Sequence, residues 1–204
     1  MQVYDTRFYG LDNQKLSDSQ ESKLLEEGIA VNSTASLDFS NKNAISALGN
    51  PTEGALLLWL HNNNVDYREL REDATILAEL PFSTERKYMA TVVESSLLPQ
   101  KKILYVKGAP EIVLSLCKQV EGNVKNEEIA KQLHDYQNQA MRTLGFAYQI
   151  LDDGDKTIAD GKVVAKNLTF EGIVAISDPV RVEVPDAVRE CMDAGINVKI
   201  VTGD

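Results

Sequence analysis

The chain has 204 residues, of which 43% are hydrophobic and 25% carry a charge, and this composition suits a globular protein with a sizeable core. Its net charge of −10 argues against nucleic acid and anionic membrane surfaces as partners, because both are bound by basic faces. The two cysteines and two histidines are isolated in the sequence, which indicates a reducing compartment and argues against a zinc site. The longest apolar stretch, residues 55–60, is too short to span a bilayer.

Helices are predicted in the first part of the chain. Asn50 is a good N-cap, Pro51 suits the first helical position, and Glu53 stands where it would complete a capping box. We expect this helix to run through residue 60 and a second helix to cover residues 67–74.

From residue 75 onward, β-branched and aromatic residues indicate strands. These cover residues 76–80, 88–94, 101–106, 146–151, 162–165 and 168–176, with an amphipathic helix over residues 127–144. Asp152-Asp153-Gly154 and Asp160-Gly161 are short turns between the later strands. We therefore expect an α+β domain in which an antiparallel sheet is flanked by helices.

The pattern changes again near residue 171. A helix that begins at Pro185 and ends before Gly195 separates two apolar runs, the second over residues 197–201, which is typical of a βαβ unit with buried parallel strands. We expect residues 1–170 to form one domain and residues 171–204 to be a βαβ fragment of a Rossmann-like domain. Because a complete α/β domain would have to continue beyond this point, we interpret the chain as a piece of a larger enzyme.

Polar side chains follow both strands of that predicted unit. Asp178 and Arg181 come after the first strand, and Thr202, Gly203 and Asp204 come after the second. Open α/β sheets bind ligands at the carboxyl ends of their strands, so the two loops would lie together. Each loop alone is also a common turn, but the pair favours a site for phosphate and a hydrated metal.

Three further segments have both an ordinary and a functional interpretation. Lys107-Gly108 precedes a short helix and is either a plain turn or a place where a ligand approaches Gly108 beside the Lys107 ammonium. Phe82 is either a core residue or, with Lys87 nearby, an adenine-stacking ring with a phosphate clamp. Arg142 is expected at the end of the long helix, where by default it is solvated or neutralises the helix dipole.

Taken in order, six segments of the chain resemble P-type cation-transporting ATPases, and the pattern is most similar to the calcium-pump branch. They are residues 51–56, 82–89, 107–111, 141–145, 178–181 and 202–204. The resemblance implies a nucleotide-binding domain followed by the start of the second part of the phosphorylation domain. It also implies ATP as ligand, Mg²⁺ as cofactor of the full-length enzyme, and a cytoplasmic location in an integral membrane protein whose phosphorylation, actuator and membrane domains are the partners.

The resemblance implies a role for each matching residue. Phe82 stacks on adenine, Glu53 approaches the adenine edge and Arg142 reaches the phosphates. The nucleotide pocket is lined by Lys87, Met89, Lys107 and Gly108. The γ-phosphate and the phosphorylation site are served by Asp178, Arg181, Thr202, Gly203 and Asp204.

No catalytic residue is expected in the chain, since it lacks the Asp-Lys-Thr-Gly-Thr loop that supplies the acceptor aspartate. We expect weak ATP binding without hydrolysis. Asn50 and Thr84 depart from some calcium pumps, which have an acidic residue and an arginine there, and the Gly-Asn-Pro-Thr-Glu run is nearer the plasma-membrane-type subgroup.

Two alternatives stay open. The first is a fragment of a haloacid-dehalogenase-like phosphohydrolase with a cap domain, although the Asp-x-Asp nucleophile that such an enzyme needs near a strand end is missing from the sequence. The second is a structural or partner-binding domain in which the motifs are only turns and helix caps.

Overall fold

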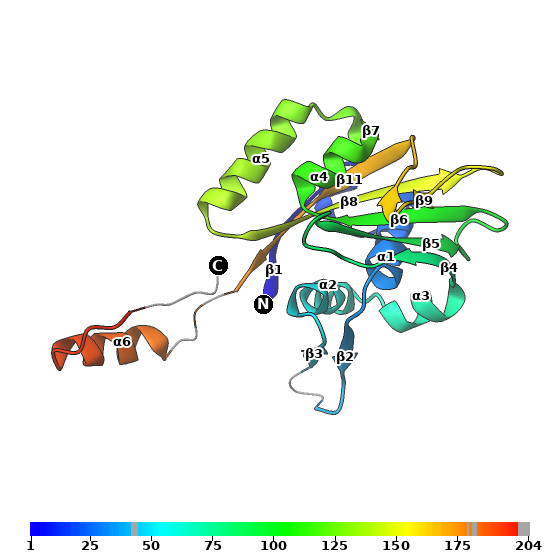
Figure 1. Cartoon of the computed structure of the whole chain (residues 1–204). Coiled ribbons are helices and arrows are strands. Elements are labelled where there is room, and N and C mark those ends of the chain that lie inside the picture. The colour runs from blue at the N-terminus through cyan, green and yellow to red at the C-terminus, as the bar shows by residue number, and fades with distance from the viewer. Residues whose placement is uncertain (42–44, 179, 181–182, 200–204) are drawn as a thin grey trace.

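The computed structural model describes residues 1–41, 45–178, 180 and 183–199, without the side chains of Asn13 and Asn123. A seven-stranded sheet forms its centre, in the order β1-β11-β8-β6-β5-β4 with β7 beside β11 (Figure 1). Neighbouring strands are antiparallel except for β7 and β11, which are parallel. The strands are β1 (Gln2–Phe8), β4 (Thr75–Leu80), β5 (Tyr88–Glu94), β6 (Lys102–Gly108), β7 (Cys117–Val120), β8 (Arg142–Leu151) and β11 (Leu168–Ser177).

Helices cover both faces of this sheet, with α1, α2 and α3 on one side and α4 and α5 on the other (Figure 1). Two small hairpins and two short 3-10 helices complete the described chain. The helices are α1 (Gln20–Val31), α2 (Pro51–Asn62), α3 (Tyr67–Asp73), α4 (Pro110–Leu116), α5 (Asn126–Asn138), α6 (Val184–Asp193), η1 (Asp12–Gln14) and η2 (Glu121–Asn123). The hairpins are β2 (Ser36–Asp38) with β3 (Ser46–Leu48), and β9 (Ile158–Ala159) with β10 (Lys162–Val163). The prediction of an antiparallel sheet flanked by helices is confirmed.

The apolar core has a layer on each face of the sheet. In β11, Ile173 and Ala175 belong to the layer that α4 and α5 cover, whereas Val174 and Ile176 belong to the layer beneath α1 and α2. Successive side chains of a strand point to opposite faces, so a strand covered on both faces can be apolar at consecutive positions, as β11 is over residues 172–176. This burial explains the uninterrupted apolar run in the sequence.

The predicted helix over residues 127–144 is wrong in its last part. Helix α5 ends at Asn138, Ala140 adopts a left-handed conformation with φ 54°, and β8 begins at Arg142. Residues 142–144 pair with β11, where Arg142 lies opposite Ile176. Pairing within the central sheet outweighs the intrinsic helical preference of Arg142 and Leu144. Arg142 therefore starts a strand and does not end a helix.

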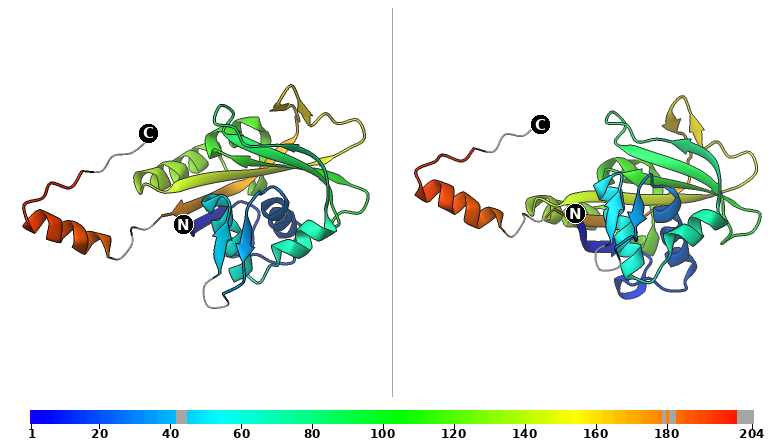
Figure 2. Two further views of the ribbon diagram at one scale, coloured as in Figure 1. Left: turned by 60° about the horizontal axis from the view of Figure 1, so that its bottom comes forward. Right: turned by 90° about the horizontal axis from the view of Figure 1, so that it is seen from below.

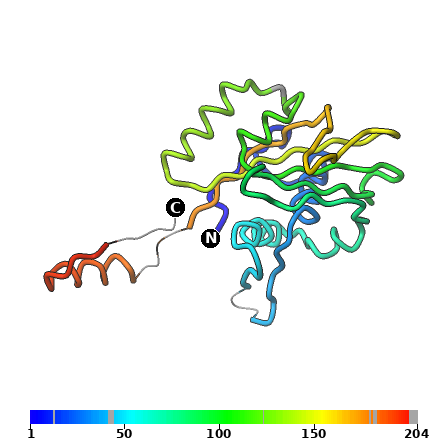
Figure 3. Tube along the Cα trace, viewed as in Figure 1, coloured from blue at the N-terminus to red at the C-terminus, as the bar shows by residue number. Residues whose placement is uncertain are grey.

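The predicted domain boundary after residue 170 falls inside β11. This strand continues to Ser177, which lies opposite Gln2 of β1, so the first and last strands of the sheet run side by side (Figure 3). Because residues 172–176 pair on both sides with antiparallel neighbours, a parallel βαβ unit is not confirmed. On this topology, we propose that the boundary lies after Ser177.

Helix α6 confirms the helix predicted from Pro185, and Gly195 follows its end with φ 76°. It lies apart from the sheet and has no buried residue (Figure 2). Residues 197–199 form no strand, and Ile200 and Val201 of the predicted strand lie outside the described residues. Among the described helices, including α6, we find none with the length and apolar character to cross a bilayer.

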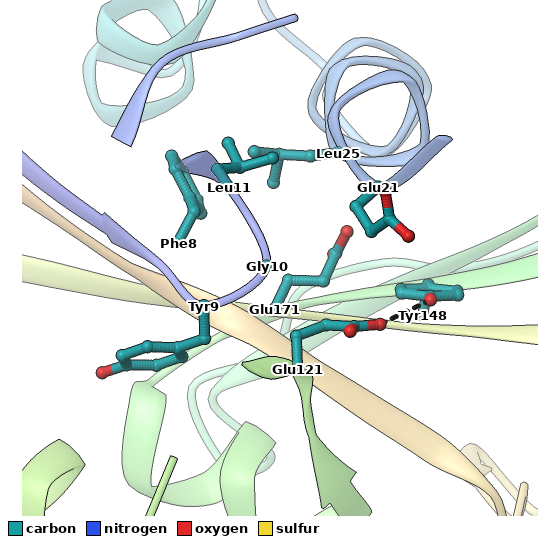
Figure 4. A pocket seen from close by; sticks show the side chains of 9 residues that line it. All are labelled: Phe8, Tyr9, Gly10, Leu11, Glu21, Leu25, Glu121, Tyr148 and Glu171. Atoms are coloured by element: carbon teal, nitrogen blue, oxygen red, sulfur yellow. Dashed lines mark hydrogen bonds between the residues drawn. The ribbon is translucent and has the colours of Figure 1, made fainter. Parts of the chain in front are cut away.

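A carboxylic acid, Glu171, is buried in the middle of β11. Glu171 is 6% exposed and borders a cavity of about 10 Å³, which has room for about one water molecule (Figure 4). Tyr148 of β8 also lines this cavity and donates a hydrogen bond of 2.7 Å to Glu121 of η2. Burial, and then the charge of Glu121, raise the pKa of Glu171 to about 8. The folded protein therefore holds a proton on Glu171 at neutral pH.

We expect Glu171 to make stability fall as pH rises. Between its ordinary pKa of 4.5 and about 8, the folded state keeps a proton that the unfolded chain has lost. Stability from this group is complete below the lower value and falls by about 1.4 kcal/mol per pH unit across the window. Urea unfolding at several pH values should show this fall in stability in the wild type but not in Glu171→Gln. Glu121→Gln should narrow the pH range of the fall, because the charge of Glu121 helps to raise the pKa of Glu171. Parallel profiles for the wild type and Glu171→Gln would contradict this assignment.

Candidate functional site

A pocket of about 480 Å³ lies where several elements meet at one edge of the sheet. It is lined from the start of α2, the loop after β4, the start of β5, the end of β6 and the start of β8. The strand register explains this meeting, because Met89 of β5 lies opposite Lys107 of β6, and Gly108 lies opposite Gly145 of β8. Segments far apart in the sequence thus supply neighbouring walls.

All seven residues predicted to bind the nucleotide line this pocket. They are Glu53, Phe82, Lys87, Met89, Lys107, Gly108 and Arg142. Sequence reasoning did not assign Thr52, Thr143 and Leu144, which also line it, although they belong to segments that carry the resemblance. Two residues that depart from the family pattern, Asn50 and Thr84, are lining residues as well, although sequence reasoning assigned neither a role toward a ligand. The role of each residue toward a ligand stays a prediction.

A buried ion pair joins α2 to β6 at this pocket. The Nζ atom of Lys107 lies 2.8 Å from Oε1 of Glu53, and the two side chains are only 3% and 8% exposed. The other oxygen, Oε2, accepts hydrogen bonds of 2.8 Å from both the backbone N–H and the hydroxyl of Thr34. Both carboxylate oxygens of Glu53 therefore have partners within the protein.

The environment shifts the pKa values of both partners downward, which favours the charged form of Glu53 but not that of Lys107. Burial alone would raise the pKa of Glu53, but Lys107 and the two hydrogen bonds from Thr34 outweigh it and leave this pKa below its usual range. Burial lowers the pKa of Lys107 more than the attraction of Glu53 raises it. The carboxylate is thus held ionised beside a cation that is poorly solvated.

The capping box predicted for α2 is only half formed. Asn50 does cap the helix, since its side chain accepts hydrogen bonds from the N–H groups of Thr52 at 2.9 Å and Glu53 at 3.3 Å. The carboxylate of Glu53 turns instead to Thr34 and Lys107. A hydrogen bond to a charged group is stronger than one to a backbone N–H. The carboxylate of Glu53 therefore binds the Lys107 ammonium and not the N–H of Asn50.

Phe82 is not a core residue, because its exposed fraction is 57%. It lies in a closed turn in which the Arg86 guanidinium donates to the carbonyl of Pro81 and the N–H of Lys87 donates to the carbonyl of Ser83 at 2.7 Å. An aromatic ring presented to a pocket from a fixed turn is the arrangement that stacking on a flat ligand needs.

Gly108 is explained in the first place by strand packing. A Cβ atom at this position would lie 2.3 Å from the carbonyl oxygen of Lys87 and 2.5 Å from Cα of Tyr88, so only glycine allows β5 and β6 to approach here. Such a contact with backbone cannot be relieved by moving a flexible side chain. The same lack of a side chain leaves the pocket wall open at Gly108, which lines it.

Arg142 stands exposed at the start of β8. Its guanidinium is 3.5 Å from the Thr52 hydroxyl, a long hydrogen bond that leaves its other donors available for an anion entering from this side of the pocket.

The second predicted cluster, for the γ-phosphate, cannot be assembled from the described residues. Asp178 is exposed directly after β11, and its carboxylate lies 3.6 Å from the amino group of Met1. Arg181, Thr202, Gly203 and Asp204 lie outside the described residues. Within the part of the chain that is described, no group of three or more His, Cys, Asp or Glu residues could hold a metal ion.

Removing one partner of the buried ion pair is expected to destabilise the folded protein. Lys107→Met leaves the Glu53 carboxylate buried without its cation, and we expect a loss of about 3–5 kcal/mol in the free energy of unfolding. The same change in the exposed pair of Lys101 and Asp152 should cost less than about 1 kcal/mol. Chemical denaturation of these two variants, of Glu53→Gln and of the double variant Glu53→Gln with Lys107→Met measures the coupling energy of the buried pair. Equal losses for Lys107→Met and Lys101→Met would contradict the buried pair.

Comparison with known proteins adds evidence independent of this geometry. Residues 21–183 match the family model described as P-type ATPase, cytoplasmic domain N. A calcium-transporting ATPase, PAT1 of Dictyostelium discoideum, is 37% identical over 89% of this chain and 16% of its own length. The plasma membrane-type calcium-transporting ATPase 2 of Arabidopsis thaliana is 34% identical over 100% of this chain and 21% of its own length.

A relative with a different named ion is also similar. The human sodium/potassium-transporting ATPase subunit alpha-2 is 32% identical over 76% of the chain. The chain spans 16% to 21% of the length of these three relatives. Because the family model matches most of its residues, the chain belongs to the P-type ATPase cytoplasmic domain N family.

Proposed function

We propose that this chain is the ATP-binding part of a P-type ATPase that transports a cation, and that the cation is calcium. The pocket carries the first part of the proposal: the exposed ring of Phe82 stands beside a cavity of about 480 Å³ that Lys87, Lys107 and Arg142 also line. Pockets of roughly 300–1,000 Å³ are typical for small ligands. The printed names of two of the relatives support calcium.

The charges around the pocket support a polyphosphate ligand. The whole chain has a net charge of −10, so an anion approaches against an unfavourable field unless cations are gathered locally. Three cationic side chains from three different strands or loops line this one pocket. Adenine would stack on Phe82, and the phosphates would extend toward Arg142 at the start of β8.

Weak binding is expected from these contacts. Stacking of a base on an aromatic ring contributes about 1–3 kcal/mol. Each partly exposed cation adds less than about 1 kcal/mol. The sum is close to the ~4 kcal/mol of a millimolar complex. Affinity of this order suits a domain that must release its nucleotide in every cycle.

In the full-length enzyme, the chain would hold ATP while its γ-phosphate is transferred to an aspartate elsewhere in the protein. The chain's own residues would supply binding and orientation for an in-line transfer. In the full-length enzyme Mg²⁺ would accompany the ATP phosphates, whereas the described residues of this chain offer no cluster of acidic groups to hold it. We expect the domain to work on the cytoplasmic side of a membrane protein, with the phosphorylation, actuator and membrane domains as partners.

The residues after Ser177 would begin the second part of the phosphorylation domain. In this proposal α6 packs on that domain in the full-length enzyme, where its exposed Val184 and Met192 would be covered. The haloacid-dehalogenase-like alternative is not favoured, because the matching family and relatives are P-type ATPases.

An ATP titration followed by amide NMR tests the proposed function. We expect millimolar binding, with shifts concentrated at Phe82, Lys87, Lys107 and Gly108 and independent of added Mg²⁺. Phe82→Ala should weaken binding about tenfold through the lost stacking. Tyr4→Ala is the matched control, since Tyr4 is equally exposed at 56% but does not line the pocket. No shifts at millimolar ATP, or equal losses in the two variants, would refute ATP binding at this pocket.

A further inference from the structure

Arg71 of α3 makes an unusual set of contacts for an arginine on a short surface helix. Its Nε donates to the carbonyl of Ala30 at 2.7 Å, and its Nη2 donates to the carbonyls of Ser33 at 3.1 Å and Ala35 at 2.9 Å. Its guanidinium also lies over the ring of Tyr67, 4.8 Å from the centroid. One side chain thus fixes the last turn of α1 and the segment that follows it.

The carbonyls of Ser33 and Ala35 flank Thr34, which is the residue that holds Glu53. The N–H and hydroxyl of Thr34 both donate to Oε2 of Glu53 at 2.8 Å. This leaves Oε1 of Glu53 for the ammonium of Lys107, also at 2.8 Å. A continuous chain of contacts therefore runs from Arg71 through residues 33–35 and Glu53 to Lys107 in the pocket wall.

A second residue of α3 contacts the same segment at a point further along the chain. The hydroxyl of Tyr67 accepts a hydrogen bond of 2.9 Å from the N–H of Leu37. Thr34 itself is exposed, so burial does not keep its two donors in place. Its position depends on backbone contacts on either side, and Arg71 makes the two nearest of them.

We propose that Arg71 is a positioning residue for the pocket: by binding the carbonyls on both sides of Thr34, it aligns the Glu53 carboxylate and so fixes the Lys107 ammonium that lines the pocket. The effect on nucleotide affinity rests on the proposed function, whereas the effect on Glu53 does not. Lysine in place of Arg71 keeps the positive charge but cannot span three carbonyls, so Arg71→Lys separates alignment from electrostatics.

The first measurement needs no ligand. The carboxyl carbon of Glu53 is titrated by NMR in the wild type, Arg71→Lys and Thr34→Val. Lys107, Arg71 and the two donors of Thr34 face this carboxylate. Thr34→Val removes the hydroxyl donor and Arg71→Lys misaligns both donors, so each variant loses part of what holds the pKa of Glu53 down. We expect the pKa of Glu53 to rise in both variants. Arg68→Lys is the matched control, because Arg68 lies on the same helix, is exposed and pairs with Asp66.

A general loss of stability would not change the titration of one carboxyl group while the amide spectrum stays native. An unchanged pKa of Glu53 in a natively folded Arg71→Lys variant would overturn the proposal. If Arg71→Lys fails to give a native spectrum, Thr34→Val tests the link from Thr34 to Glu53 on which the role of Arg71 depends, since Thr34 is exposed and its hydroxyl can be removed without disturbing the core. An unchanged pKa of Glu53 in Thr34→Val would then overturn it.

The second measurement is ATP affinity in the same variants. We expect Arg71→Lys and Thr34→Val to bind about fivefold more weakly, the effect of one lost hydrogen bond, and Arg68→Lys to bind as the wild type does. Equal affinities in Arg71→Lys and the wild type would overturn the role of Arg71 in the pocket. If the wild type itself does not bind ATP, the proposed function fails, and the Glu53 titration still decides whether Arg71 aligns the carboxylate.

Discussion

The pocket depends on one buried ion pair, Glu53 with Lys107. Moving two charges out of water costs several kcal/mol for each ion, and an apolar pair of similar size would often be at least as stable. A buried pair of this kind is therefore weak evidence for stability alone. Both partners line the same cavity, and we propose that the pair serves to present the Lys107 ammonium to a ligand.

The pair in turn constrains the elements around it. Asn50 and Pro51 must start α2 where Glu53 reaches the end of β6, and β5 must approach β6 closely enough that only glycine fits at residue 108. Thr34 then completes the hydrogen bonds of the carboxylate, and Arg71 holds the backbone carbonyls on both sides of Thr34. The pocket is thus a product of helix capping, strand register and loop anchoring together, with cations gathered against a negative overall charge.

Local signals in the sequence predicted the helix start and the strand that depend on neighbouring residues. The start of α2 follows from Asn50-Pro51, and β5 matches the expected range, because caps and strand patterns act over a few residues. The seven pocket residues came from the order of family segments, and the fold brings them to one place.

Contacts between distant segments could not be predicted in the same way. Residues 139–144 continue a helical pattern in the sequence, but pairing with β11 makes Arg142 the start of a strand. The apolar run over β11 resembles a buried parallel strand, since burial on both faces gives the same composition whatever the strand direction. Thr34 and Arg71 carry no local signal, because their partners lie 19 and 36 to 41 residues away.

The most direct test of nucleotide binding at this pocket is an isotope-filtered NOE experiment on the chain with ATP. We expect cross-peaks between the adenine protons and the ring protons of Phe82, together with weaker ones to Met89, both of which line the cavity. Such cross-peaks would place adenine on the Phe82 side of the Glu53–Lys107 pair. Cross-peaks only to aromatic rings outside the pocket, such as Tyr4, or none under conditions where ATP is bound, would contradict it.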